Sequence, residues 1–324
     1  MLKSEGSLSA DTAIVDSEID SIMSSTTPRD PNTPRATASS LPRWLTAGLV
    51  AGTFLTIAIL ERRRPLRRSV EPVLQRTGRN LAIAALGAIA VHVVEMPIVA
   101  PAAAAVERRR WGVLKRLRLP VWLEVCAAVL LMDYTLYVWH VLTHRVPVLW
   151  RFHAVHHIDL DLDASTAVRF HFGELTLSTP WRLAQVVVIG TSPLALSIWQ
   201  TGLLMSILFH HSNLELPLAI ERRLGCVFVT PRMHGIHHSQ VHSETDSNWS
   251  SGLTVWDWLH GTLKLNVPQS RITIGVPAYQ DPNDVTLPKL VVLPFEPQRP
   301  YWISADGDEP FRAGSAPPPT PLLP

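Results

Sequence analysis

Long apolar segments alternate with polar and basic ones along this chain. The segments are residues 44–60, 81–94, 119–139 and 183–214. A membrane span needs about 17–25 largely apolar residues, so the first and third segments predict transmembrane helices. The second has 14 residues before Glu95 and Pro97 interrupt it and a run of alanines follows, which predicts a transmembrane or re-entrant helix. The fourth has no charged side chain over 32 residues and is broken at Thr191-Ser192-Pro193, which predicts a hairpin of two helices. The pattern indicates an all-α integral membrane protein with about four such helices.

The two ends of the chain have a different composition. Residues 1–40 are rich in Ser, Thr, Asp and Pro and lack apolar periodicity, and residues 301–324 contain the sequence APPPTPLLP. Such segments cannot bury enough apolar surface to fold, so both ends are predicted to be disordered tails. A single membrane-embedded domain is therefore expected over residues 41–300.

The basic residues leave the topology open. The loop 61–79 contains seven arginines and the loop 101–118 contains six Lys or Arg residues, and both would favour the cytoplasm. A second helix that crosses the membrane would separate them. Either this helix is re-entrant and broken between Glu95 and Pro97, or one loop lies along the lipid headgroups.

Composition narrows the class of protein. Charged residues make up 17% of the chain, against about 25% in ordinary soluble domains. The net charge of +2 does not indicate a nucleic-acid partner, and Cys126 and Cys226 stand too far apart for a zinc ribbon. Histidine is the unusual residue, since thirteen of 14 lie between His140 and His260.

Most of these histidines form three spaced clusters and one adjacent pair. The clusters are His140-x3-His144, His153-x2-His156-His157 and His234-x2-His237-His238, and the pair is His210-His211. On a helix, residues three and four apart share one face, so each cluster can direct several imidazoles at one point. Eight imidazoles exceed a single zinc site, and two ions sharing them would each have about four. Imidazole suits Zn, Cu, Fe and Ni, so the ligand type does not choose the metal.

Hydrolytic signatures do not fit the histidine clusters. A metallopeptidase HExxH motif needs Glu after the first His, but Val141, Ala154 and Gly235 occupy those positions. No GxSxG, GxGxxG or Walker sequence is present. An isolated histidine such as His92 or His260 is expected to be an ordinary residue of the membrane interface.

The ordered motifs resemble those of the fatty acid hydroxylase/sterol desaturase superfamily of membrane di-iron proteins, and most closely its bacterial sterol desaturase-like branch. HVLTH, LWRFHAVHH, FHHSN, MHGIHHS and WDWLHGT carry the resemblance, which extends over about residues 45–295. It implies a histidine-rich cytoplasmic cap, here residues 140–260, with two iron ions that use O2 to hydroxylate or desaturate a lipid. The ligands it implies are His140, His144, His153, His156, His157, His210, His234, His237 and His238, with His171 as a further candidate.

Asp133 is a candidate for supporting this site. It precedes His140 by two helical turns, so its carboxylate is expected to accept an imidazole N–H and orient a ligand. The alternative is an ion pair with an arginine of a neighbouring helix.

The resemblance also implies partners and a location. The lipid is the substrate, and electrons are expected from a separate ferredoxin- or cytochrome-type protein. The expected location is the bacterial inner membrane with a cytoplasmic active site. The competing hypothesis is a membrane metal-binding or transport protein without enzymatic activity, although the clusters lie at span ends rather than at the bilayer midplane.

Overall fold

The structure is a computed structural model that describes residues 39–312. The predicted N-terminal tail lies outside this range except for its last two residues, as does the predicted C-terminal tail beyond residue 312. Residues 301–312 are described, and Tyr301 and Trp302 pack against an apolar core of the cap.

The described residues are helical, and the long apolar helices confirm the predicted all-α membrane class. Four are long and apolar enough to cross a bilayer: α2 (Arg43–Arg63), the run Val73–Arg116, α6 (Val121–Arg145) and α9 (Pro193–His211). Less than half of each span is buried within the protein, which leaves the rest of its surface for lipid. The chain is thus an integral membrane protein.

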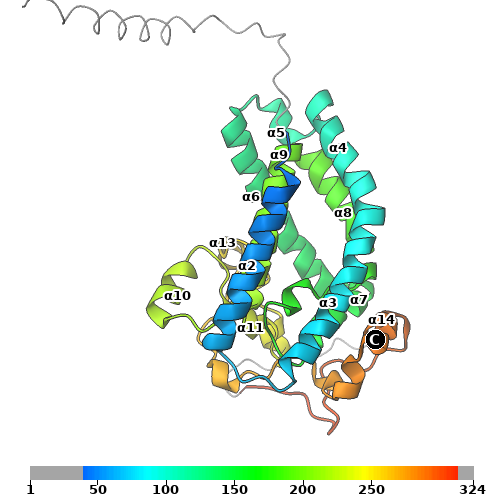
Figure 1. Ribbon diagram of the computed structural model, residues 1–324, viewed down its shortest axis with the longest axis vertical. Coiled ribbons are helices and arrows are strands. Elements are labelled where there is room, and N and C mark those ends of the chain that lie inside the picture. The colour runs from blue at the N-terminus through cyan, green and yellow to red at the C-terminus, as the bar shows by residue number, and fades with distance from the viewer. Residues whose placement is uncertain (1–38, 313–324) are drawn as a thin grey trace, which may run out of the picture. The chain divides into compact units, whose positions relative to one another are not determined.

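The helices place the two basic loops at opposite ends of the bundle (Figure 1). The second span comprises α3 (Val73–Ala90), a π-helical turn (Val91–Glu95) and α4 (Met96–Arg109), and it continues without reversing. The second span is therefore not re-entrant, which was one of the two alternatives that the sequence allowed. In the π turn the N–H of Met96 reaches Val91 O, and the wider turn accommodates Pro97, which has no N–H of its own.

The predicted break of the fourth apolar segment into two helices is confirmed. Helix α8 (Phe172–Ile189) ends at Gly190, whose φ of 89° is the left-handed conformation that favours glycine. Helix α9 then begins with Ser192, whose side chain accepts from Ala195 N, and with Pro193 in its first turn. Helix α8 begins eleven residues before the predicted apolar segment. The segment is defined by the absence of charge, and α8 contains the charged residues Glu174 and Arg182.

The cap gathers at one end of the bundle from segments far apart in the sequence. Its helices are α7 (Pro147–His157), α10 (Leu218–Leu224), α11 (Pro231–His237), α12 (His242–Thr245), α13 (Val255–Leu259) and α14 (Leu287–Val292). Trp150, Ile158, Tyr279 and Leu290 belong to one apolar core that joins α7 to the C-terminal segment. Burial of such side chains contributes roughly 1.5–3 kcal/mol each and holds the cap together.

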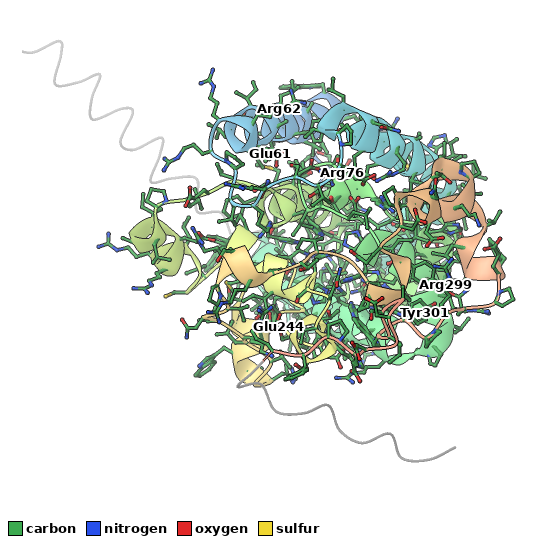
Figure 2. The ribbon with its side chains drawn as sticks, turned by 90° about the horizontal axis from the view of Figure 1, so that it is seen from below. Glu61, Arg62, Arg76, Glu244, Arg299 and Tyr301 are labelled. Atoms are coloured by element: carbon green, nitrogen blue, oxygen red, sulfur yellow. The ribbon has the colours of Figure 1, made fainter. Side chains whose placement is uncertain are left out.

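A buried ionic network joins the cap to the spans. Arg76 on α3 is 1% exposed and pairs with Asp159 at 3.0 Å and with Asp163. Glu61 on α2 accepts from the backbone N–H groups of Ala164 and Asn213. Figure 2 views the molecule from this end and shows Glu61 and Arg76 on the inner side of their helices.

Candidate di-metal site

The histidine-bearing helices meet at the junction of bundle and cap. His140 and His144 lie one turn apart at the end of α6. Helix α6 ends before Val146, which has an extended conformation. Pro147 then begins α7, which carries the second cluster. Helix α11 carries the third, and α9 ends at His211.

The structure brings nine histidines into two adjoining groups. Group 1 consists of His140, His144, His153, His157 and His237. Group 2 consists of His156, His211, His234 and His238. Within each group the possible ligand nitrogens lie within 4.8 Å of one another.

Each HxxHH cluster contributes to both groups. His153 and His157, four residues apart, belong to group 1, and His156 between them belongs to group 2. In the other cluster His234 and His238 belong to group 2, and His237 belongs to group 1. This follows from helix geometry, because residues i and i+4 share a face while residue i+3 lies displaced around the axis. The two adjacent histidines at the end of each HxxHH cluster thus allow one short helix to contribute imidazoles to both groups.

Four histidines are oriented by hydrogen bonds from Nδ1. His140 donates to Trp249 O at 2.7 Å, His237 to Ser247 O at 2.8 Å and His211 to Ile207 O at 2.8 Å. His153 Nδ1 lies 2.9 Å from a carboxylate oxygen of Glu174. Such bonds place the proton on Nδ1 and leave the lone pair of Nε2 for a metal.

The ring nitrogens without a hydrogen-bond partner are suited to bind a metal ion. In group 1, the Nε2 atoms of His144, His153, His157 and His237 are buried without a hydrogen-bond partner. Buried polar groups are rarely left unsatisfied, and the ligand nitrogens of these four residues also lie within 4.8 Å of one another, so a shared metal ion would satisfy them. Burial, reinforced by His153 and His211, lowers the pKa of His237 to about 3, and burial also holds the pKa of His157 well below its usual range. Both rings are therefore neutral, as metal binding requires.

Group 2 provides a second test. His211 Nε2 lies 3.0 Å from Nε2 of both His156 and His234, and the Nε2 atoms of His234 and His238 are 3.2 Å apart. His211 donates its Nδ1 proton to Ile207 O, so its Nε2 has a single lone pair and no proton. Hydrogen bonding therefore cannot explain the close approach of this Nε2 to two neighbouring nitrogens. Imidazole nitrogens bound to one ion at about 2.1 Å lie about 3.0–3.4 Å apart, which matches these separations. The two groups are consistent with a di-metal site.

Two predicted ligand candidates lie outside the groups. Neither ring nitrogen of His210 has a partner, and its ring lies beside that of His234 at 4.2 Å, while the adjacent His211 belongs to group 2. His171 caps α8: its Nδ1 accepts from Gly173 N, and its Nε2 donates to Val291 O. Both nitrogens of His171 are therefore occupied by the backbone.

Asp133 is not placed beside an imidazole. Its Oδ2 accepts from Leu253 N at 3.0 Å and from the indole of Trp256 at 2.7 Å, and no arginine pairs with it among residues 39–312. It holds the loop 249–256 against α6, and Trp249 in that loop accepts from His140. Its link to the histidines is therefore indirect.

The residues that do orient the imidazoles were not identified from the sequence. Glu174 is separated from His153 by 21 positions, and the other acceptors are backbone carbonyls, which leave no residue-type signal. Asp159, two residues after the second cluster, pairs with Arg76 and Arg169 and not with an imidazole.

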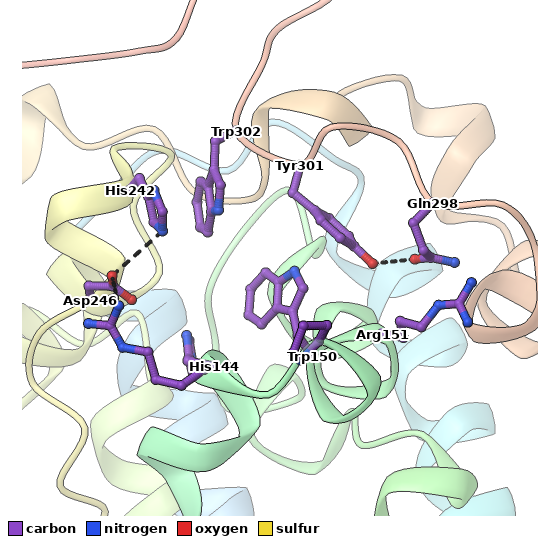
Figure 3. Close-up of a pocket in the computed structure, with 10 residues that line it drawn as sticks. His144, Trp150, Arg151, His242, Asp246, Gln298, Tyr301 and Trp302 are labelled. Atoms are coloured by element: carbon purple, nitrogen blue, oxygen red, sulfur yellow. Dashed lines mark hydrogen bonds and ion pairs between the residues drawn. The ribbon is translucent and has the colours of Figure 1, made fainter. Parts of the chain in front are cut away.

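A cavity of about 340 Å³ opens beside group 1 (Figure 3). His144 and Trp150 line it from the α6–α7 corner, and Tyr301 and Trp302 line it from the C-terminal segment. The rings of His144 and Trp150 are 4.9 Å apart, and those of Trp150 and Trp302 are 5.8 Å apart. The cavity connects a histidine of group 1 with the surface of the cap.

Comparison with known proteins identifies a shared region. Residues 125–262 match the sequence profile of a family described as fatty acid hydroxylase. The chain is 31% identical over 158 residues to an ornithine lipid hydroxylase of Rhizobium tropici, which covers 48% of this chain and 46% of the relative. It is 30% identical to the cholesterol 25-hydroxylase of Mus musculus, covering 47% and 51% of the two chains.

A third relative is the alkylglycerol monooxygenase of Homo sapiens, 30% identical over 43% of this chain and 30% of the relative. The chain thus spans about half the length, or less, of these relatives. No solved structure is a significant match.

Proposed function

We propose, from the match of residues 125–262 to the fatty acid hydroxylase family, that the chain is a membrane lipid hydroxylase that uses O2 and two iron ions. The observation that carries the proposal is the pair of buried histidine groups at the end of the apolar spans. Hydroxylation is favoured over desaturation because the three relatives are named as hydroxylases or a monooxygenase.

The histidines of groups 1 and 2 would hold one ion each. Bound iron would supply the O2 activation that oxidation of an unactivated C–H bond requires. The protein contributes neutral imidazoles whose Nδ1–H groups are fixed by Trp249, Ser247 and Ile207.

The proposed substrate is a lipid of the surrounding bilayer. The relatives are named for an ornithine lipid, for cholesterol and for an alkylglycerol, all with extended hydrocarbon parts. His140 and His144 end a membrane-spanning helix, so a C–H bond of a lipid can approach them from the bundle. The balanced reaction is RH + O2 + 2 electrons + 2 H⁺ giving ROH + H2O.

The two electrons are proposed to come from a separate ferredoxin- or cytochrome-type protein. The cavity that joins His144 to the cap surface is the proposed side of approach. We place the cap in the cytoplasm, at the bacterial inner membrane, because the arginine-rich loop 61–68 lies at the same end.

The test is lipid analysis of cells that express the chain under ¹⁸O2. The proposal expects a lipid whose mass rises by one ¹⁸O atom, and its loss in the double variant His237→Ala, His238→Ala. A His92→Ala variant is the control and should keep the product. Metal-loaded protein that forms no oxygenated lipid, even with reductant supplied, would instead favour a metal-binding or transport role.

A further inference from the structure

A lobe of the cap exposes an unusual amount of apolar surface. The lobe consists of residues 217–228, which include α10, and residues 253–267, which include α13. Its side chains Leu218, Ile220, Phe228, Trp258 and Leu259 are between 48% and 71% exposed. Helix α10 stands out from the rest of the cap in both views (Figures 1 and 2). Surfaces of this kind mark contact with a protein or a membrane.

The contacts of the lobe place it at membrane depth. Asp133, halfway along the span α6, accepts from Leu253 N and the Trp256 indole. Ser206 in the span α9 donates to Ser251 O at 2.7 Å. In Figure 1, α10 and α13 lie at the height of the lower half of α2 rather than beyond its end. This position beside two spans would bring the apolar side chains of the lobe into contact with lipid.

A groove of about 740 Å³ runs through this lobe. Leu218, Val255, Trp258 and Leu265 supply apolar walls, and Met233 and Ile236 of α11 line it as well. Its volume lies within the range of small-molecule sites, roughly 300–1,000 Å³. None of the nine grouped histidines lines it, so it is separate from the candidate di-metal site.

The charges at the groove are positive. Glu221 lines it but is 4% exposed and bonded to Arg232 at 2.8 Å, which neutralises it. Arg222 lines the groove and Arg223 is its neighbour on α10; both are exposed and form no ion pair within residues 39–312. The basic loop is adjacent, since Arg64 O accepts from Glu215 N just before α10. Apolar surface beside free arginines is the pattern of segments that bind anionic lipid headgroups.

We propose that this groove binds an anionic phospholipid, with an acyl chain between α10 and α13 and the phosphate at Arg222 and Arg223. The site is accessory: it anchors the lobe in the leaflet at the cap end and does not depend on turnover.

The native Cys226 lines the groove and allows a direct test. The full chain with Cys126→Ser is labelled at Cys226 with the fluorophore NBD and reconstituted in phosphatidylcholine vesicles. Phosphatidylglycerol or phosphatidylcholine with a nitroxide on the acyl chain is then added at the same low mole fraction. Phosphatidylglycerol should quench at a lower fraction, because each arginine contributes about fivefold in affinity for an anionic lipid.

Arg222→Gln with Arg223→Gln should remove this preference while quenching by both lipids persists. The matched control, Arg108→Gln with Arg116→Gln, changes two exposed arginines at the other end of the bundle and should keep it. Absence of quenching by either lipid would overturn the membrane contact. Equal quenching by both lipids in the labelled chain that keeps Arg222 and Arg223 would overturn headgroup recognition. Neither outcome bears on lipid hydroxylation, which is measured separately.

Discussion

His210 and His211 are neighbours at the end of α9, yet their rings have different surroundings. Both rings lie 4.2 Å from the ring of His234, but only His211 brings a ring nitrogen within the spacing of group 2. The Nδ1–H of His211 is held by Ile207 O one turn earlier. His210 points beside the group with both nitrogens unpaired.

The two neighbours therefore give a sharp comparison. His211→Ala should lower the bound metal by about one ion per chain, because group 2 would keep three imidazoles. His210→Ala should leave the metal content unchanged. Both are measured by elemental analysis of purified protein, with His92→Ala as a further control. Metal loss in His210→Ala alone would reverse the assignment.

Asp133 stabilises a loop rather than a ligand. Asp133→Asn keeps an acceptor oxygen but removes the charge, and hydrogen bonds to charged groups contribute about 1.5–3 kcal/mol. We expect unfolding free energy to fall by about 1–2 kcal/mol, with little change in metal content, in thermal unfolding of detergent-purified protein. Trp256→Phe, which removes the indole donor, should reproduce part of this loss. Weaker metal retention without any loss of stability would restore a direct role at an imidazole.

At the scale of elements, the apolar segments and histidine spacing predicted most of the architecture. The spans, the break at Ser192–Pro193 and the convergence of the three clusters follow from local pattern. Which of His210 and His211 belongs to group 2 depends on which face of α9 points toward that group. The nearly uniform apolar sequence of α9 does not predict this orientation. The partner of Asp133 lies 120 positions away, and no spacing rule reaches that far.

The π turn explains how the second span passes Glu95 and Pro97. Deleting Val93 would restore α-helical winding with little rotation of α4 relative to α3, because a π turn takes up one extra residue. It would also leave Pro97 in a regular helix. A loss of about 3 kcal/mol or more is expected, measured as a lower unfolding temperature and membrane yield.

Val93→Ala is the matched control for that deletion and should be nearly neutral, since Val93 is 65% exposed. Adding Pro97→Ala to the deletion should recover part of the loss. Full stability of the deletion variant would show that the π turn has no structural role.

At the scale of the described molecule, the cap and the loop 101–118 lie at opposite ends of the bundle (Figure 1). Asp306→Cys and Arg108→Cys place single thiols at these two ends, in a background without Cys126 and Cys226. An impermeant thiol reagent should label only Arg108→Cys in intact cells and both in lysed cells, because the cap is expected in the cytoplasm. The reverse result would put the cap outside. Equal labelling in intact cells would contradict the opposite placement of the two ends.

The sharing of each HxxHH cluster between both groups has a consequence for metal loading. His156 and His157 are fixed to one backbone, so an ion held by His157 also positions the ring of His156 for the other ion. Binding of the first ion therefore orders most of α7 and α11. The second ion then binds with a smaller cost in conformational entropy. Loading should be cooperative: at half-saturating metal, a population of empty and doubly filled chains should exceed the singly filled form.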